Sequence, residues 1–161
     1  MYGFYTWEGY QAGDNGKEIP FQPELAADAV RGSIIQVVLV EPGKLARIAE
    51  VGTSLDAMQQ TVGGDIEACY PFEEQVCIVC NSEGKINGLP LNRAIRDEDT
   101  NEIVDIIAGT FFICNCRKES FGSLSKEQQK RYLEKYRLPE RFSRTRDGIE
   151  SVPYKPKGRD R

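Results

Sequence analysis

The apolar residues of this sequence fall into short runs separated by turn-forming residues, and this spacing limits the fold to one built around a sheet. The longest run, Ile34–Val40, is rich in β-branched residues and is interrupted by Gln36. A run of this length predicts a buried strand and is much shorter than the ~20 apolar residues that cross a bilayer. No basic region followed by an apolar stretch opens the sequence, so we expect a cytoplasmic protein without a membrane anchor.

Other segments in the centre of the chain have the length and composition of strands. We predict these strands over Ala46–Val51, Asp65–Tyr70, Val76–Asn81 and Ile103–Cys116. A glycine at position 109 predicts a bulge or bend in the last range, which then supplies one or two strands. Gly88–Arg93 contains a proline that cannot donate to a ladder, and we expect this segment to leave the sheet.

Helix signals occur at two places. Thr53 or Ser54 is the predicted N-cap of a short helix that runs to about Thr61 and stops at the glycine pair 63–64. Ser125-Lys126-Glu127-Gln128 fits a capping box, in which a serine is followed three residues later by a glutamine. The capping box predicts a helix over Leu124–Arg137, with an apolar stripe wide enough to dock on a sheet.

Together these segments predict an α+β fold: a small mixed, mostly antiparallel sheet with one short helix, followed by a C-terminal helix and a flexible basic tail. A length of 161 residues suggests one domain. We divide the chain into an aromatic N-terminal arm or hairpin (1–32), an α+β core (33–117), a helix that docks on the core (118–142) and the tail (143–161).

Aromatic side chains crowd the N-terminal arm, at Tyr2, Phe4, Tyr5, Trp7 and Tyr10. A turn at 13–16 favours a hairpin of residues 2–10 against 17–21, because Asn and Gly accept a positive φ. The aromatic residues have two interpretations. They form a contact surface for a base or a protein partner, or they pack onto apolar surface of the core.

The sequence contains no histidine and five cysteines. Without histidine, the usual Ser-His-Asp and Cys-His nucleophiles are excluded, and we predict no catalytic residues and no enzyme activity. Cys77-x-x-Cys80 with Cys114-x-Cys116 has some resemblance to a zinc site, but residues three apart on a strand face opposite sides. We therefore expect small buried hydrophobes rather than a metal site, and we predict no cofactor.

Charge is divided unevenly along the chain. Residues 1–117 hold 8 basic and 18 acidic residues, whereas residues 118–161 hold 13 basic and 7 acidic residues. Such a split is typical of an interaction tail, and a solvated terminus that balances charge explains it equally well. A basic tail with an interleaved Tyr154 also allows nucleic-acid binding, which the acidic body opposes.

One polar cluster stands out as a candidate ligand- or partner-binding site. It joins a turn at 81–85 to an irregular segment that ends in an Asn-Arg pair, and loops held by a sheet commonly carry binding residues. The candidate residues are Asn81, Glu83, Lys85, Asn92 and Arg93. Arg93 suits bidentate pairing with a carboxylate or phosphate. The alternative is that Asn92 and Arg93 satisfy local backbone carbonyls and Glu83.

From about Gln36 to Cys114 the sequence resembles the domain of unknown function 3846 family. The matching features are Val40-Glu41-Pro42-Gly43, Leu55 with Val62-Gly63-Gly64-Asp65-Ile66-Glu67, Asn81-Ser82-Glu83-Gly84-Lys85, Gly88-Leu89-Pro90-Leu91-Asn92-Arg93 and Ile107-Ala108-Gly109-Thr110. The resemblance implies an accessory protein of a bacteriophage or mobile genetic element and no catalytic residues. At Ser82 the family more often has an acidic residue.

These observations predict a non-enzymatic binding protein of a phage or mobile element, an accessory or counter-defence factor that acts on a host macromolecule. A host or phage protein is the expected partner. The first alternative is a protein that binds or sequesters a nucleotide-like small molecule with the five candidate residues. The second is nucleic-acid binding through the basic tail. Self-association into a homo-oligomer stays open.

Overall fold

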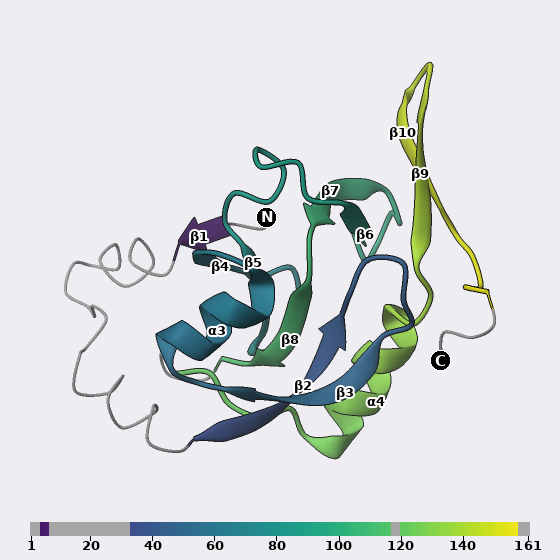
Figure 1. Ribbon diagram of the computed structural model, residues 1–161. Coiled ribbons are helices and arrows are strands. Elements are labelled where there is room, and N and C mark those ends of the chain that lie inside the picture. Colours follow the sequence, from purple (N-terminus) through teal and green to yellow (C-terminus); the bar gives the residue numbers. More distant parts are fainter. Residues whose placement is uncertain (1–3, 7–32, 117–119, 158–161) are drawn as a thin grey trace.

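A six-stranded antiparallel sheet forms the centre of the molecule in the computed structural model, which describes residues 4–6, 33–116 and 120–157 (Figure 1). Its strands follow the order β1-β4-β5-β8-β2-β3. Their bounds are Phe4–Thr6 (β1), Ile34–Val40 (β2), Arg47–Gly52 (β3), Ile66–Cys69 (β4), Val76–Asn81 (β5) and Phe111–Asn115 (β8). Every neighbouring pair in this sheet is antiparallel. The predicted α+β class with a mostly antiparallel sheet is confirmed.

Two further hairpins and two helices complete the described part of the chain. β6 (Leu91–Arg96) pairs with β7 (Ile103–Ala108), and β9 (Glu140–Thr145) pairs with β10 (Gly148–Pro153). The helices are α3 (Leu55–Val62) and α4 (Lys126–Lys135). Neither of these helices has the length and apolar character that a membrane crossing requires.

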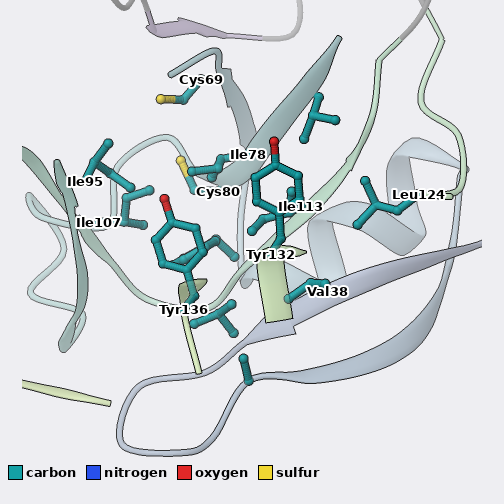
Figure 2. Packing of buried hydrophobic residues seen from close by; sticks show 14 residues of the cluster. Val38, Cys69, Ile78, Cys80, Ile95, Ile107, Ile113, Leu124, Tyr132 and Tyr136 are labelled. Atoms are coloured by element: carbon teal, nitrogen blue, oxygen red, sulfur yellow. The ribbon is translucent and has the colours of Figure 1, made fainter. Parts of the chain in front are cut away.

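The central sheet is buried on both faces because each face has its own cover. On one face, Met58 and Val62 of α3 pack against sheet residues such as Val37 and Phe112. On the other face, Tyr132 and Tyr136 from the α4 region pack against the sheet together with β6 and β7, as Figure 2 shows. This double burial explains why β5 reads as a continuous apolar run rather than an alternating one.

Both helices begin as the sequence predicts. The Ser54 hydroxyl accepts a hydrogen bond from the Ala57 backbone N–H at 3.0 Å, and α3 stops at Gly63, whose φ of 86° is unfavourable for a side chain. The capping box of Ser125 and Gln128 is present in both directions at the start of α4. The strands Ile34–Val40 and Val76–Asn81 have the bounds predicted for them.

Gly88–Arg93 leaves the six-stranded sheet as predicted, but its interpretation as an irregular segment is wrong for its last residues. Residues from Leu91 onward form β6, which pairs with β7 with two irregularities in register. Proline does not prevent this, because Pro90 lies just before the strand. There its carbonyl accepts from the Gly109 N–H at 2.8 Å, and its missing N–H leaves no gap in the ladder.

The prediction of a flexible tail from residue 143 is also wrong, because residues 140–153 form the β9–β10 hairpin. The hairpin extends away from the sheet at one end and is attached at its base (Figure 1). At the base, the Glu140 carboxylate accepts from the Ala94 N–H at 2.9 Å and from the Ser151 hydroxyl at 2.6 Å. Residues 158–161 lie outside the described residues.

Only a short part of the predicted aromatic arm can be compared with the structure. Phe4–Thr6 forms the edge strand β1, paired antiparallel with β4 so that Thr6 lies opposite Glu67. Main-chain pairing therefore ties this segment to the core sheet. The rest of the arm, residues 1–3 and 7–32, lies outside the described residues, and so does the second strand of the predicted hairpin.

Candidate functional site

The loop that joins β5 to β6 presents the most exposed large apolar side chain among the residues that the structure describes. Ile86 is 82 % exposed. We call residues 82–90 the contact loop. Burial of this side chain against a partner would be favourable, because it removes apolar surface from water. The conformation of this loop therefore decides whether it can serve as a binding element.

Backbone hydrogen bonds within the contact loop fix its shape. The Asn87 N–H donates to the Glu83 carbonyl at 2.9 Å, and the Leu89 N–H donates to the Gly84 carbonyl at 2.9 Å. Gly88 has a φ of 74°, a conformation that glycine adopts without strain. The loop thus has two consecutive turns of its own around Ile86 and is preorganised on both sides of it.

Asn81 ties the start of the contact loop to the core. Its side-chain oxygen accepts from the Glu83 N–H at 2.8 Å, and its amide nitrogen donates to the Val62 carbonyl at 3.3 Å. The Asn81 residue is 8 % exposed. The Asn81 side chain therefore hydrogen-bonds both to the contact loop and to the end of α3, and it links the two.

The middle of the loop is held against β7. Gly84 lies so close to this strand that a Cβ atom would be 2.5 Å from the Ala108 carbonyl oxygen, so only glycine fits. The Lys85 ammonium forms an ion pair with the Asp105 carboxylate at 2.8 Å. Glu83 is exposed, and its side chain has no hydrogen-bond partner within the described ranges.

Asn92 ties the far end of the contact loop to the sheet. It is 1 % exposed, and its amide donates to the Gly109 carbonyl at 2.8 Å and to the Val40 carbonyl at 3.0 Å. Gly109 in turn packs against Leu89, which lies 2.7 Å from where a Cβ atom of Gly109 would be. The bend predicted at Gly109 is present, with a φ of 89°.

Arg93 is fully buried, with an exposure of 0 %. Its guanidinium donates to the Tyr136 carbonyl at 3.0 Å, to the Lys44 carbonyl at 2.8 Å and to the Asn92 side-chain oxygen at 2.9 Å. Burial lowers the pKa of Arg93 to about 10, so the group stays charged at neutral pH. Arg93 thus connects β6, the end of α4 and the β2–β3 turn.

The five residues predicted as one binding site therefore do not line one cavity. A cavity of about 230 Å³ beside the contact loop is lined by Asn81 and Lys85 but not by Glu83, Asn92 or Arg93. Asn92 and Arg93 satisfy backbone carbonyls, which was the alternative interpretation of this pair, although Glu83 takes no part. Asn81, Lys85 and Asn92 hold the contact loop and its ends in place, whereas Arg93 stabilises the fold next to the loop.

The small cavity beside the loop holds carboxylates and a thiol. Burial, together with the nearby Asp105 carboxylate, raises the pKa of Glu67. Burial also raises the pKa of Cys80 to about 12, and the carboxylates of Glu67 and Asp105 add to this effect. A thiol with this pKa is protonated at neutral pH and is a poor nucleophile.

Cys77 and Cys114 lie opposite each other on β5 and β8, with their sulfur atoms 4.0 Å apart. Both are buried, and burial raises the pKa of Cys77 well above its usual range. Among the described residues, no group of three or more His, Cys, Asp or Glu side chains is arranged to hold a metal ion. Burial of the Cys77–Cys114 pair agrees with their interpretation as small core residues.

The sequence analysis named residues of the contact loop and its supports as candidates, and it missed the most exposed residue of the loop, Ile86. Ile86 lies between Lys85 and Asn87 in a polar turn, where an apolar residue stands out once the turn is recognised. Asp105 was also missed, because its partner Lys85 is 20 residues away. The requirement for glycine at position 84 depends on an approach to Ala108 that no local pattern indicates.

Fold and loop together define a small α+β protein with a preorganised, exposed loop. The chain belongs to the domain of unknown function 3846 (DUF3846) family, whose model matches residues 35–137, more than half of the chain. The contact loop lies inside this matched range, whereas the β9–β10 hairpin lies beyond it. No curated protein and no solved structure matches the chain significantly.

Proposed function

We propose that this chain is a non-enzymatic binding protein that contacts a protein partner through the contact loop, with Ile86 as the anchor. The observation that carries this proposal is an exposure of 82 % for an isoleucine on a loop fixed at both ends. A preorganised loop loses little conformational entropy on binding, so it gains affinity from a single buried apolar side chain. Such anchors commonly fill a pocket on the partner.

The setting of this activity follows from the family resemblance. We propose that the partner is a host or phage protein in the bacterial cytoplasm and that the chain is an accessory or counter-defence factor of a mobile element. A protein partner suits an apolar anchor better than a nucleotide-like ligand does. The arginine expected to hold a phosphate is instead buried among backbone carbonyls.

The charges of the β9–β10 hairpin do not favour the nucleic-acid alternative. Residues 140–153 carry three arginines, Arg141, Arg144 and Arg146, and three acids, Glu140, Asp147 and Glu150. Affinity for a phosphate backbone depends on a net excess of cations that release counterions. The hairpin has no such excess, and within the described residues the tail adds only Lys155 and Lys157 beyond it.

Site-specific photo-crosslinking tests the proposal. A photoreactive amino acid with an aliphatic side chain, which keeps an apolar group at the anchor position, replaces Ile86 in one variant and Val152 in another, and each is irradiated in host-cell lysate. Val152 is the matched control, because it is also an exposed β-branched residue, at 57 %, on the β9–β10 hairpin. We expect one discrete adduct at position 86 that is absent at position 152.

Competition then establishes the role of the side chain. Excess unlabelled wild-type protein should abolish the adduct at position 86, and excess Val152→Thr should abolish it equally. Excess Ile86→Thr should compete at least about tenfold less well, since burying an isoleucine on binding contributes about 1.5–3 kcal/mol. Equal competition by Ile86→Thr, or the same adducts at both positions, would refute the proposed loop contact.

A further inference from the structure

The contact loop carries an Asn-Gly dipeptide, Asn87-Gly88, next to its exposed isoleucine. Both residues are exposed, and a Cβ atom built on Gly88 would meet no atom within 4 Å. The backbone nitrogen of a glycine is the least hindered nitrogen of a protein chain, because no Cβ atom lies beside it. The dipeptide therefore places an accessible nitrogen directly after the carboxamide of Asn87.

Asn87 differs from the other asparagines of the described ranges in the freedom of its side chain. Asn81 and Asn92 are buried, and hydrogen bonds hold their side-chain amides in place. Asn101 and Asn115 each precede a larger residue, glutamate or cysteine. The Asn87 carboxamide is exposed and has no hydrogen-bond partner within those ranges. It is therefore free to turn toward the backbone nitrogen of the next residue.

The carboxamide and this nitrogen can react with each other without an enzyme, because they belong to adjacent residues. The Gly88 nitrogen attacks the side-chain carbonyl carbon, Cγ, of Asn87 and forms an N–Cγ bond. The Cγ–Nδ2 bond breaks, and Nδ2 leaves as ammonia with the proton that the Gly88 nitrogen gives up. Water then hydrolyses the cyclic imide at either of its carbonyl groups. The product is aspartate or isoaspartate, and no oxidant or reductant takes part.

The fold slows this ring closure without blocking it. In the loop the Gly88 N–H donates to the Lys85 carbonyl at 3.2 Å, which is the upper end of the usual N–H···O range. This hydrogen bond must open before the nitrogen can attack. The cost of opening one such bond predicts a rate about two- to tenfold lower than in a free peptide.

The reaction changes the loop where its shape is fixed. The Leu89 N–H donates to the Gly84 carbonyl at 2.9 Å across the dipeptide, and an isoaspartate displaces this donor because it lengthens the main chain by a carbon atom. Both products also place a new carboxylate beside Ile86, on a loop where Glu83 is already exposed. Burial of Ile86 against a partner then requires the removal of a charge from water, which is unfavourable.

We propose that Asn87 is a site of spontaneous deamidation by water, and that its conversion weakens the contact made by Ile86. The modification itself depends only on the chemistry and exposure of the loop. Its effect on binding rests on the proposed function of the contact loop. Separate measurements therefore test the modification and the effect on binding.

Peptide mapping of the full chain tests the modification. The folded protein is incubated at mildly alkaline pH and digested in acid, and each asparagine is followed by mass spectrometry. We expect a gain of one mass unit at position 87, with isoaspartate detected by an isoaspartyl methyltransferase. Asn101 is the matched control, because it is also exposed but precedes glutamate, and it should stay unmodified over the same period.

Two comparisons identify the cause of the conversion. A synthetic peptide of residues 82–91 should convert about two- to tenfold faster than the folded chain. Asn87→Gln should stay unmodified, because its longer side chain would have to close a larger ring. Conversion at position 87 no faster than at position 101 would overturn the assignment, and so would a folded chain that stays intact while the peptide converts completely.

Competition for the photo-crosslinked adduct at position 86 tests the effect on binding. Asn87→Asp introduces the new charge and should compete at least about threefold less well than the wild type. Asn101→Asp introduces the same charge outside the contact loop and should compete like the wild type, as should Asn87→Gln. Equal competition by Asn87→Asp and Asn101→Asp would overturn the effect on binding. The absence of any adduct at position 86 would refute the proposed contact and this effect with it, whereas the modification would still be decided by the mass at position 87.

Discussion

Arg93→Met distinguishes a structural arginine from a ligand-binding one. Methionine retains much of the apolar stem of arginine and removes the guanidinium. The charged donor then no longer serves the carbonyls of Tyr136 and Lys44, at 3.0 Å and 2.8 Å. A hydrogen bond from a charged group contributes about 1.5–3 kcal/mol, so the two bonds together contribute about 3–6 kcal/mol.

Removal of the guanidinium also removes the cost of burying a charge, which offsets part of this loss. We expect a net destabilisation of about 2–4 kcal/mol, against a total stability of roughly 5–15 kcal/mol for a domain of this kind. Arg93→Lys should lose nearly as much, because one ammonium cannot reproduce the planar fork of donors.

Urea unfolding followed by far-UV circular dichroism measures this loss. The midpoint should fall by about 1–2 M for a urea slope of roughly 2 kcal/mol per M. Arg96→Met is the matched control. Arg96 is only half-buried, and its guanidinium bonds to the carbonyls of Asn101 at 2.9 Å and Ser151 at 3.4 Å. That variant should lose less than about 1 kcal/mol.

A loss below about 1 kcal/mol in Arg93→Met would refute this reasoning. If the same variant lost a nucleotide-induced thermal shift shown by the wild type, Arg93 would be a ligand-binding residue after all. The two results can be distinguished, because the loss of a structural arginine lowers the free energy of unfolding without any ligand, whereas the loss of a ligand-binding arginine abolishes the ligand-induced shift.

Two further predictions follow from single contacts. Gly84→Ala places a Cβ atom 2.5 Å from the Ala108 carbonyl oxygen, so thermal unfolding should show a loss of about 1–3 kcal/mol, and the adduct at position 86 should weaken with it. The absence of both effects would mean that the loop is not held against β7. A hydrogen bond from the Tyr132 hydroxyl lowers the pKa of Glu74 below its ordinary value of 4.5. The stability from this carboxylate is therefore present above that value and is lost as the pH falls through the lower folded pKa. Glu74→Gln should be up to about 1 kcal/mol less stable at pH 7, and the difference should vanish in acid. A difference that persists at low pH would exclude the carboxylate as its source.

Local patterns predicted the elements that local chemistry determines. The strand Ile34–Val40 follows from its β-branched run, and the start of α4 follows from Ser125 and Gln128, which satisfy each other's backbone. The β9–β10 hairpin was missed because its strands are polar. The turn of this hairpin did carry a sequence signal. Its two residues, Arg146 and Asp147, lie between the paired Thr145 and Gly148, and Asp-Gly is a typical hairpin dipeptide.

The role of Arg93 could not be predicted in the same way, because its acceptors are distant in sequence. The Tyr136 carbonyl is 43 residues away and the Lys44 carbonyl is 49 residues away. An arginine that follows Asn92 in a proline-containing segment resembles a binding motif until those carbonyls are known. The location of the candidate site therefore stays a prediction, while the structural roles of Asn92 and Arg93 depend on tertiary contacts that the sequence does not show.

The position of β8 has a consequence for synthesis of the protein. β8 lies between β5 and β2 in the sheet, yet it is the last of the six strands to leave the ribosome. Until Phe111–Asn115 emerges, β2–β3 and β4–β5 are separate hairpins whose facing edges have no partner. Unpaired strand edges of nascent chains are sites of aggregation. A pause in synthesis or a truncation before residue 111 would therefore leave two hairpins with unpaired, aggregation-prone edges instead of one continuous sheet.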